Sequence, residues 1–267
     1  MVNTFSSQKT KNKKFRGLSI NRMIPNMLTL LALSAGLTAI RFALDGKWEH
    51  AVLAIVVAGI LDALDGRIAR LLKGASKFGA ELDSLSDFVC FGVSPGLILY
   101  LWTMQRAGKL GWVLVMLFVI CCGLRLARFN VMLENPDAKT WKNRFFTGMP
   151  APMGGALVLL PMVFSFQVGE AYFRQPWISS IFLLIMAGMM VSRIPTYSFK
   201  NLKINRQWIL PTMLITGGIT LSIINAPWVS LSLIGCAYIA TIPFSYRAHQ
   251  ILEKNRTDAG NIDKNTS

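Results

Sequence analysis

The chain has 267 residues, of which 53% are hydrophobic and only 15% are charged, and its net charge is +15. Soluble domains carry about one quarter charged residues, so this composition excludes an ordinary soluble domain and indicates a polytopic membrane protein. The positive charge lies in the joints between apolar runs and does not form a basic face on a folded soluble domain. It therefore favours an anionic membrane surface, and not nucleic acid, as a partner.

Apolar segments of the length that a membrane helix needs, about 20 residues, recur along the chain. They predict an all-α bundle of about eight transmembrane helices in a single catalytic domain, residues 23–246, between a basic tail (1–22) and a polar tail (247–267). The predicted helices are 24–44, 50–72, 87–105, 110–128, 150–168, 177–192, 208–224 and 227–246.

Lysine and arginine residues are divided unevenly between the two sides of this predicted bundle. Twenty-three of the 28 lie in the tails and in the alternate joints on the same side, and five lie on the other side. Because cytoplasmic loops carry the excess of Lys and Arg, we expect a multi-pass protein of the cell membrane with both tails in the cytoplasm. The joint between the second and third helices then also faces the cytoplasm, where a water-soluble nucleotide can reach it.

Four aspartates lie in two pairs, where the second predicted helix ends and the third begins. A helix turns about 100° per residue, so each pair shares one helix face, provided that the next helix begins near residue 79. The two faces consist of Asp62, Asp65, Gly66, Ala69 and Arg70 on the first helix, and of Gly79, Asp83 and Asp87 on the next. Two antiparallel helices joined by a short loop would bring all four carboxylates together.

Four carboxylates in one place repel one another and need cations nearby. Oxygen ligands suit Mg²⁺ or Mn²⁺, and two such ions about 4 Å apart can clamp a pyrophosphate during a displacement. In the alternative interpretation, the aspartates only form ion pairs that stabilise a helix end. The basic residues available for such pairs are Arg67, Arg70, Lys73 and Lys77. Pairing does not require ordered spacing over 26 residues, so we favour a metal site.

The run D-x2-D-G-x2-A-R-x8-G-x3-D-x3-D, from Asp62 to Asp87, resembles the signature of the CDP-alcohol phosphatidyltransferases without a departure. The resemblance implies a six-helix membrane core, often dimeric, that transfers a phosphatidyl group from a CDP-linked lipid to an alcohol and releases CMP. It also implies that Asp62, Asp65 and Asp83 are metal ligands. Asp87 would both bind metal and act as the base that takes the proton from the acceptor hydroxyl.

Other residues are expected to contact the CDP portion of the lipid. The resemblance implies this role for Gly66, Arg70 and Ser76, and Gly79, like Gly66, lets a ligand approach the backbone. On the first helix, Pro-Asn-Met-Leu-Thr at 25–29 resembles the family's nucleotide-side segment, which adds Asn26 and Thr29. An interfacial helix cap is an equally good explanation of Asn26.

Recognition of the acceptor is expected outside the signature, at the cytoplasmic end of the fourth predicted helix. Arg125 and Arg128 are three residues apart and share a face, so either could bind a carboxylate through two nitrogens. Asn130 offers an amide to an amine or hydroxyl. Positive-inside charge at a helix end is the other explanation of the two arginines.

The segments 123–130, 146–152 and 192–201 look like the phosphatidylserine synthase branch of the family, and the two helices beyond a six-helix core agree with it. This resemblance implies CDP-diacylglycerol as the donor and L-serine as the acceptor. A phosphorylated alcohol, such as glycerol 3-phosphate or inositol phosphate, is the nearest alternative acceptor. The basic residues that could bind its phosphate are Arg125, Arg128, Lys139, Lys142 and Arg144. A divalent-cation transporter is a more distant alternative, because it would place carboxylates near the membrane midplane.

Overall fold

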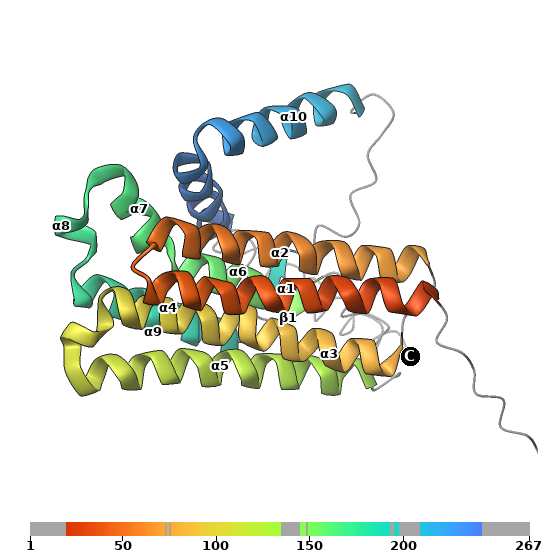
Figure 1. The fold of residues 1–267 in the computed structure, drawn as a ribbon, viewed down its shortest axis with the longest axis horizontal. Coiled ribbons are helices and arrows are strands. Elements are labelled where there is room, and N and C mark those ends of the chain that lie inside the picture. Colours follow the sequence, from red (N-terminus) through yellow and green to blue (C-terminus); the bar gives the residue numbers. More distant parts are fainter. Residues whose placement is uncertain are drawn as a thin grey trace, which may run out of the picture.

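The computed structural model describes residues 20–72, 74, 76–134, 145–147, 149–192, 195–197 and 209–241. Within this part of the chain, long helices run side by side, and α1, α2, α3 and α5 lie nearly parallel in Figure 1. The helices are α1 (Ile20–Leu44), α2 (Trp48–Leu71), α3 (Lys77–Asp87), α4 (Ser94–Trp102), α5 (Gly108–Glu134), α6 (Ala151–Val158), α7 (Leu160–Val168), α8 (Glu170–Phe173), α9 (Pro176–Val191), α10 (Ile209–Asn225) and a last helix, Pro227–Thr241.

Four helical stretches within the described residues are long and apolar enough to cross a membrane. They are Met23–Leu44, Lys77–Trp102, Met104–Met132 and Ala151–Val168. Pro176–Val191 and Pro227–Thr241 are apolar but shorter. The predicted class, a helical membrane protein, is therefore confirmed. The eight crossings and the six-helix core remain predictions.

The third predicted transmembrane range, 87–105, is the later part of a longer helix. α3 begins at Lys77, which agrees with the helix start near residue 79 that the shared face of the signature required, and it continues through a π-helical stretch, Phe88–Val93, into α4. The hydroxyl of Ser76 accepts a hydrogen bond from the backbone N–H of Gly79 (3.0 Å) and caps this helix. The signature aspartates of α3 consequently lie on the same continuous helix as the core residues of α4.

The fourth predicted helix is longer than expected. A short 3₁₀ turn, Met104–Ala107, and Gly108, at a φ of +58°, reverse the chain between α4 and α5. From there α5 continues to Glu134, beyond the predicted end at residue 128. The predicted acceptor residues therefore all lie on the last turns of α5, and none of them lies in the joint that follows.

A pair of three-residue strands departs from the all-α prediction. β1 (Phe145–Thr147) and β2 (Pro195–Tyr197) pair antiparallel, with Phe146 opposite Thr196. Aromatic and β-branched side chains favour extended backbone, which explains why these short segments form strands. The pair joins the segment after α5 to the segment after α9, and it overlaps the segments 146–152 and 192–201 that carry the resemblance to the serine branch.

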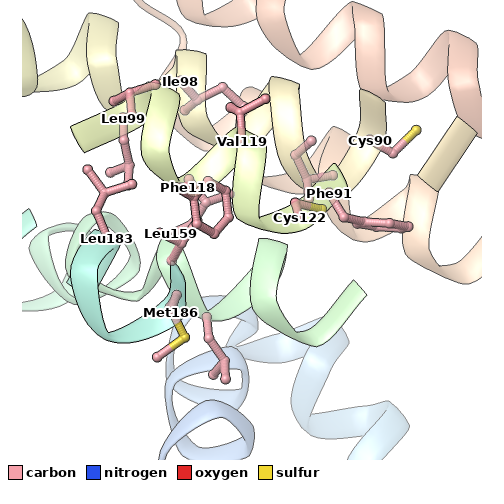
Figure 2. Close-up of a cluster of buried hydrophobic side chains, with 14 of the residues drawn as sticks. Cys90, Phe91, Ile98, Leu99, Phe118, Val119, Cys122, Leu159, Leu183 and Met186 are labelled. Carbon is pink, nitrogen blue, oxygen red and sulfur yellow. The ribbon is translucent and has the colours of Figure 1, made fainter. Parts of the chain in front are cut away.

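The apolar core lies where α4, α5, α6 to α7 and α9 meet. Figure 2 shows Phe118, which is fully buried, near the centre, with Leu99 and Leu183 on one side and Cys122 and Phe91 on the other. Phe91 belongs to the π-helical stretch, one turn beyond the last signature aspartate. Close packing in this core therefore fixes the position of the helix that carries the candidate site.

Candidate active site

Three of the signature aspartates form a carboxylate cluster. Asp62 on α2 and Asp83 and Asp87 on α3 each have an oxygen that lies within 4.8 Å of the others. Asp87 Oδ1 is buried and has no hydrogen-bond partner among the described residues. Carboxylates that are partly removed from water and this close repel one another strongly, and the orphaned oxygen needs a partner. An all-oxygen donor set of this kind fits a hard divalent cation such as Mg²⁺ or Mn²⁺.

Packing on two sides positions Asp87. The helix that carries it is bonded to α1, because the Ser86 hydroxyl donates to the Thr29 carbonyl (3.3 Å) and the Cys90 thiol donates to the Ala32 carbonyl (3.3 Å). The backbone of α6 also approaches the π-helical stretch closely. A Cβ atom at Gly155 would lie 2.7 Å from the Phe91 backbone. π-helical turns inside α-helices are frequent at functional sites, and this one directly follows the predicted base.

Asp65 points to a different neighbour from Asp62. Its side chain is buried, and its Oδ2 accepts a hydrogen bond from the hydroxyl of Thr29 on α1 at 2.6 Å. Asp83 is close enough to interact electrostatically with both Asp65 and Asp62. Asp65 is therefore a neighbour of the three-carboxylate cluster, and its role as a metal ligand remains a prediction.

A cavity of about 180 Å³, which we call the nucleotide cavity, opens beside these carboxylates between α1, α2 and α3. Five of the six residues predicted to bind the CDP portion line it, together with two of the signature aspartates. These seven residues are Asn26, Thr29, Gly66, Ser76, Gly79, Asp65 and Asp83. Five residues that the resemblance assigns to the CDP group therefore lie around one cavity, and their contact with CDP remains a prediction.

Asn26 and Gly79 meet in this cavity. A Cβ atom at position 79 would lie 2.8 Å from Asn26 Oδ1, so a larger residue there would displace the amide. Asn26 lies inside α1, which begins at Ile20, so the explanation as an interfacial helix cap is wrong. Arg70, the sixth predicted residue, is exposed and its Nε donates to the Gly66 carbonyl at 2.9 Å.

The three predicted acceptor residues do not converge on one point. Arg125 is half-buried, interacts electrostatically with Asp87 and Asp62, and places its guanidinium 5.7 Å from the centre of the Phe129 ring. Arg128 instead donates to the carbonyls of Val191 (3.0 Å) and Ser192 (3.3 Å) at the end of α9. Asn130 donates from Nδ2 to the Ser84 hydroxyl (2.9 Å). Of the three side chains, Arg125 is the one associated with the carboxylates.

Tyr238, on the last helix, is a candidate that the sequence did not reveal. Its hydroxyl is buried, and the residue interacts electrostatically with Arg125. A tyrosine inside the apolar run 227–246 resembles the aromatic residues that pack in any membrane helix, so nothing in the pattern distinguishes it. The basic residues proposed for a phosphorylated acceptor, Lys139, Lys142 and Arg144, lie outside the described residues.

Comparison with known proteins leads to the same family as the signature. The CDP-alcohol phosphatidyltransferase family model matches residues 22–194. A relative from Mycobacterium tuberculosis (strain H37Rv), named CDP-diacylglycerol–serine O-phosphatidyltransferase, is 35% identical over 90% of this chain and 83% of its own length. Relatives with the same name from Helicobacter pylori (strain 26695; 35% identity, 68% of this chain, 75% of the relative) and Bacillus subtilis (strain 168; 34%, 67% and 92%) are also similar. The chain belongs to the CDP-alcohol phosphatidyltransferase family.

Proposed function

We propose that the protein transfers the phosphatidyl group of CDP-diacylglycerol to the hydroxyl of L-serine, giving phosphatidylserine and CMP. The observation that carries this proposal is the complete signature, whose Asp62, Asp83 and Asp87 meet beside a cavity lined by the expected nucleotide-binding residues. The names of relatives that match up to 90% of the chain support serine as the acceptor.

The carboxylates would hold the metal, which we propose to be two Mg²⁺ or Mn²⁺ ions. Asp62, Asp83 and Asp87 would bind them from the cluster, and Asp65 would bind from beside it. Such ions neutralise charge on a pyrophosphate and stabilise its entering and leaving oxygens. Thr29, Asn26, Gly79 and the open backbone at Gly66 would orient the CDP group in the nucleotide cavity. Arg70 would contact it from the last turn of α2, and Ser76 from the joint that follows.

Asp87 would be the base of the transfer. It takes the proton from the serine hydroxyl, whose oxygen forms a bond to the lipid-side phosphorus. The bond between that phosphorus and the bridging oxygen then breaks, and CMP leaves with the electron pair. Arg125, which interacts with Asp87, could hold the serine carboxylate with its guanidinium fork and so place the hydroxyl next to the base. Arg128 and Asn130 would support this arrangement through α9 and α3.

We further propose the membrane arrangement expected from the sequence. Helices lie over all eight predicted ranges within the described residues, and 23 of the 28 Lys and Arg residues fall in the tails and joints predicted to be cytoplasmic. This arrangement places six helices in a catalytic core, the site at the cytoplasmic face of the cell membrane, and the basic joints against anionic lipids. A homodimer is proposed from the family resemblance.

An acceptor panel tests the function. Purified protein is incubated with CDP-diacylglycerol, Mg²⁺ or Mn²⁺, and one labelled alcohol at a time: L-serine, glycerol 3-phosphate or inositol phosphate. We expect labelled phosphatidylserine and an equal amount of CMP with L-serine. A lipid product from a phosphorylated alcohol but none from L-serine would refute the assignment. Metal flux through liposomes that lack the CDP-lipid would support the transporter alternative instead.

A further inference from the structure

The last helix, dark blue in Figure 1, packs antiparallel against α7 and α6. Near its start, the rings of Trp228 and Phe166 lie edge to face, with their centroids 4.7 Å apart. About two turns further along, a Cβ atom at Gly235 would lie 2.8 Å from Leu160 Cδ2. The last helix thus meets the end of α7 first and its beginning later, and its next turn comes level with α6.

Tyr238 belongs to that next turn. It follows Gly235 by three residues and so lies on the same helix face. It packs against the apolar core, and its hydroxyl is buried. Extending the antiparallel register by one turn brings Tyr238 level with Gly155, whose Cβ would meet the backbone of Phe91. Phe91 lies one turn beyond Asp87, so the last helix carries a polar group to the depth of the predicted base.

Helix α5 brings Arg125 to the same depth. A Cβ atom at Gly92 would lie 3.1 Å from Cys122 Sγ, and one at Gly123 would lie 3.2 Å from the Phe88 ring. Later residues of α5 therefore meet earlier residues of the π-helical stretch. Continuing this register places Arg125 level with Phe88, the residue that directly follows the predicted base.

Arg125 interacts electrostatically with Asp87, Asp62 and Tyr238. The other titratable groups near it belong to its own helix and are Cys122 and Arg128. Within the described residues, no salt bridge joins its guanidinium to either carboxylate. Such a salt bridge would occupy the fork that a substrate carboxylate needs. A phenol oxygen can accept a hydrogen bond and a guanidinium only donates, so Tyr238 is a suitable neighbour for the fork on a different helix.

We propose that Tyr238 is a positioning residue of the acceptor site, an inference that rests on the proposed function. Its hydroxyl oxygen attracts the Arg125 guanidinium from the last helix and keeps the fork from closing onto Asp87. The fork then stays open for the carboxylate of L-serine, and Asp87 stays free to take the proton. The last helix lies beyond residues 22–194, which the family model matches, so it adds to acceptor recognition from outside that region.

Tyr238→Phe tests this role because it removes the hydroxyl and keeps the ring. We expect the KM for L-serine to rise about threefold to tenfold, the usual effect of losing one polar contact. Saturating L-serine supplies a carboxylate that opens the fork, so kcat should stay within about twofold of the parent value. The KM for CDP-diacylglycerol should not change. The matched control is Tyr100→Phe, the same change at a half-buried tyrosine on α4, which should leave all three constants unchanged.

A double variant tests whether Tyr238 acts through Arg125. In the Arg125→Met protein, Tyr238→Phe should have little further effect on the KM for L-serine, because the group that it positions is absent. An equal fold-change in both backgrounds would overturn the inference. A lower unfolding temperature of Tyr238→Phe, with equal increases in the KM values for donor and acceptor, would assign Tyr238 to packing alone and overturn it as well.

Formation of phosphatidylserine by the parent protein separates this inference from the proposed function. If the parent forms none from CDP-diacylglycerol and L-serine, the proposed function fails. If the parent is active and Tyr238→Phe keeps its KM for L-serine, the positioning role fails alone. Tyr238→Met also removes the hydroxyl, and it takes the place of Tyr238→Phe, with the same expected result, if the latter does not elute as a monodisperse peak.

Discussion

Thr29 and Asp65 connect the first two helices at the site: the Thr29 hydroxyl lies 2.6 Å from Asp65 Oδ2, and both side chains are buried. The carbonyl of the same threonine accepts a hydrogen bond from Ser86 on α3. One residue of α1 thus contacts both helices that carry the signature aspartates. The nucleotide side of the site and its carboxylates are consequently a single packed unit.

Replacing Thr29 with valine should weaken the site without changing its shape. The change leaves the buried Asp65 carboxylate without its donor, which costs about 2 kcal/mol. If the whole cost falls on the transition state, kcat/KM for CDP-diacylglycerol falls by up to roughly 30-fold. Thr29→Ser keeps the hydroxyl and serves as the matched control, with activity close to that of the parent. Steady-state kinetics with varied donor measure the difference, and equal activity of the two variants would show that the hydrogen bond is unimportant.

Asp87→Asn should remove turnover and leave the fold intact. Asparagine has the same shape but takes no proton, and loss of a general base typically lowers kcat by about 10²–10⁴-fold. Release of CMP measures kcat, and retention of a fluorescent CDP-lipid analogue shows that the donor still binds. Asp45→Asn, in the exposed turn between α1 and α2, is the control for losing one carboxylate. Near-parental turnover by D87N would remove Asp87 from the role of base.

Metal removal should abolish activity and lower stability together. Without a cation, the carboxylates of Asp62, Asp83 and Asp87 repel one another. A ligand present at 100 times its Kd stabilises the folded state by about 2.7 kcal/mol, so added Mg²⁺ or Mn²⁺ should raise the unfolding temperature after chelation. Asp83→Asn removes one ligand and one repulsive charge. It should therefore raise the unfolding temperature of the metal-free protein and reduce the further increase on adding metal. An increase equal to that of the parent would argue against a metal at this cluster.

The signature could be predicted to form a site because its spacing follows the helical period. Residues separated by three or four positions share a face. This rule predicted that Asp83 and Asp87 lie together, as they do in the carboxylate cluster, and that Gly66 shares a face with Asp65, and both residues line the nucleotide cavity. The rule is coarser than side-chain geometry. Asp62 and Asp65 differ by about 60° around α2. That angle is sufficient for one to face Asp87 and the other to face α1.

Partners from distant helices could not be predicted in this way. Arg128 and Arg125 follow the same pattern in sequence, yet one is bonded to the end of α9 and the other interacts with the carboxylates. The spacing of the signature required a helix from about residue 79, but hydropathy alone placed the start of the membrane range near 87, because polar residues lower the hydropathy of the stretch 77–87. Its helical structure depends on the Ser76 cap and on packing against α1, which a hydropathy pattern does not contain.

This difference between the two arginines leads to a paired experiment. Arg125→Met removes the fork next to Asp87, and we expect about a tenfold or larger increase in KM for L-serine with little change in KM for the donor. Arg128→Met removes the hydrogen bonds to Val191 and Ser192, so it should lower the unfolding temperature and leave the KM for L-serine nearly unchanged. Kinetics and thermal unfolding of both variants check the assignment. Equal effects on KM for L-serine would contradict it.

Gly155 offers a test of how packing positions the predicted base. A Cβ atom there would lie 2.7 Å from both Cα and the carbonyl oxygen of Phe91, and backbone atoms of two packed helices have little room to move. Gly155→Ala should therefore destabilise the protein by about 1–3 kcal/mol, as overpacking does, and should also lower kcat by displacing Asp87 one turn away. Gly188→Ala in α9 is the matched control, because its Cβ would meet nothing within 4 Å. Thermal unfolding and CMP release are measured for both variants. If G155A has parental stability and turnover, contact between α6 and the π-helical stretch does not hold Asp87 in place.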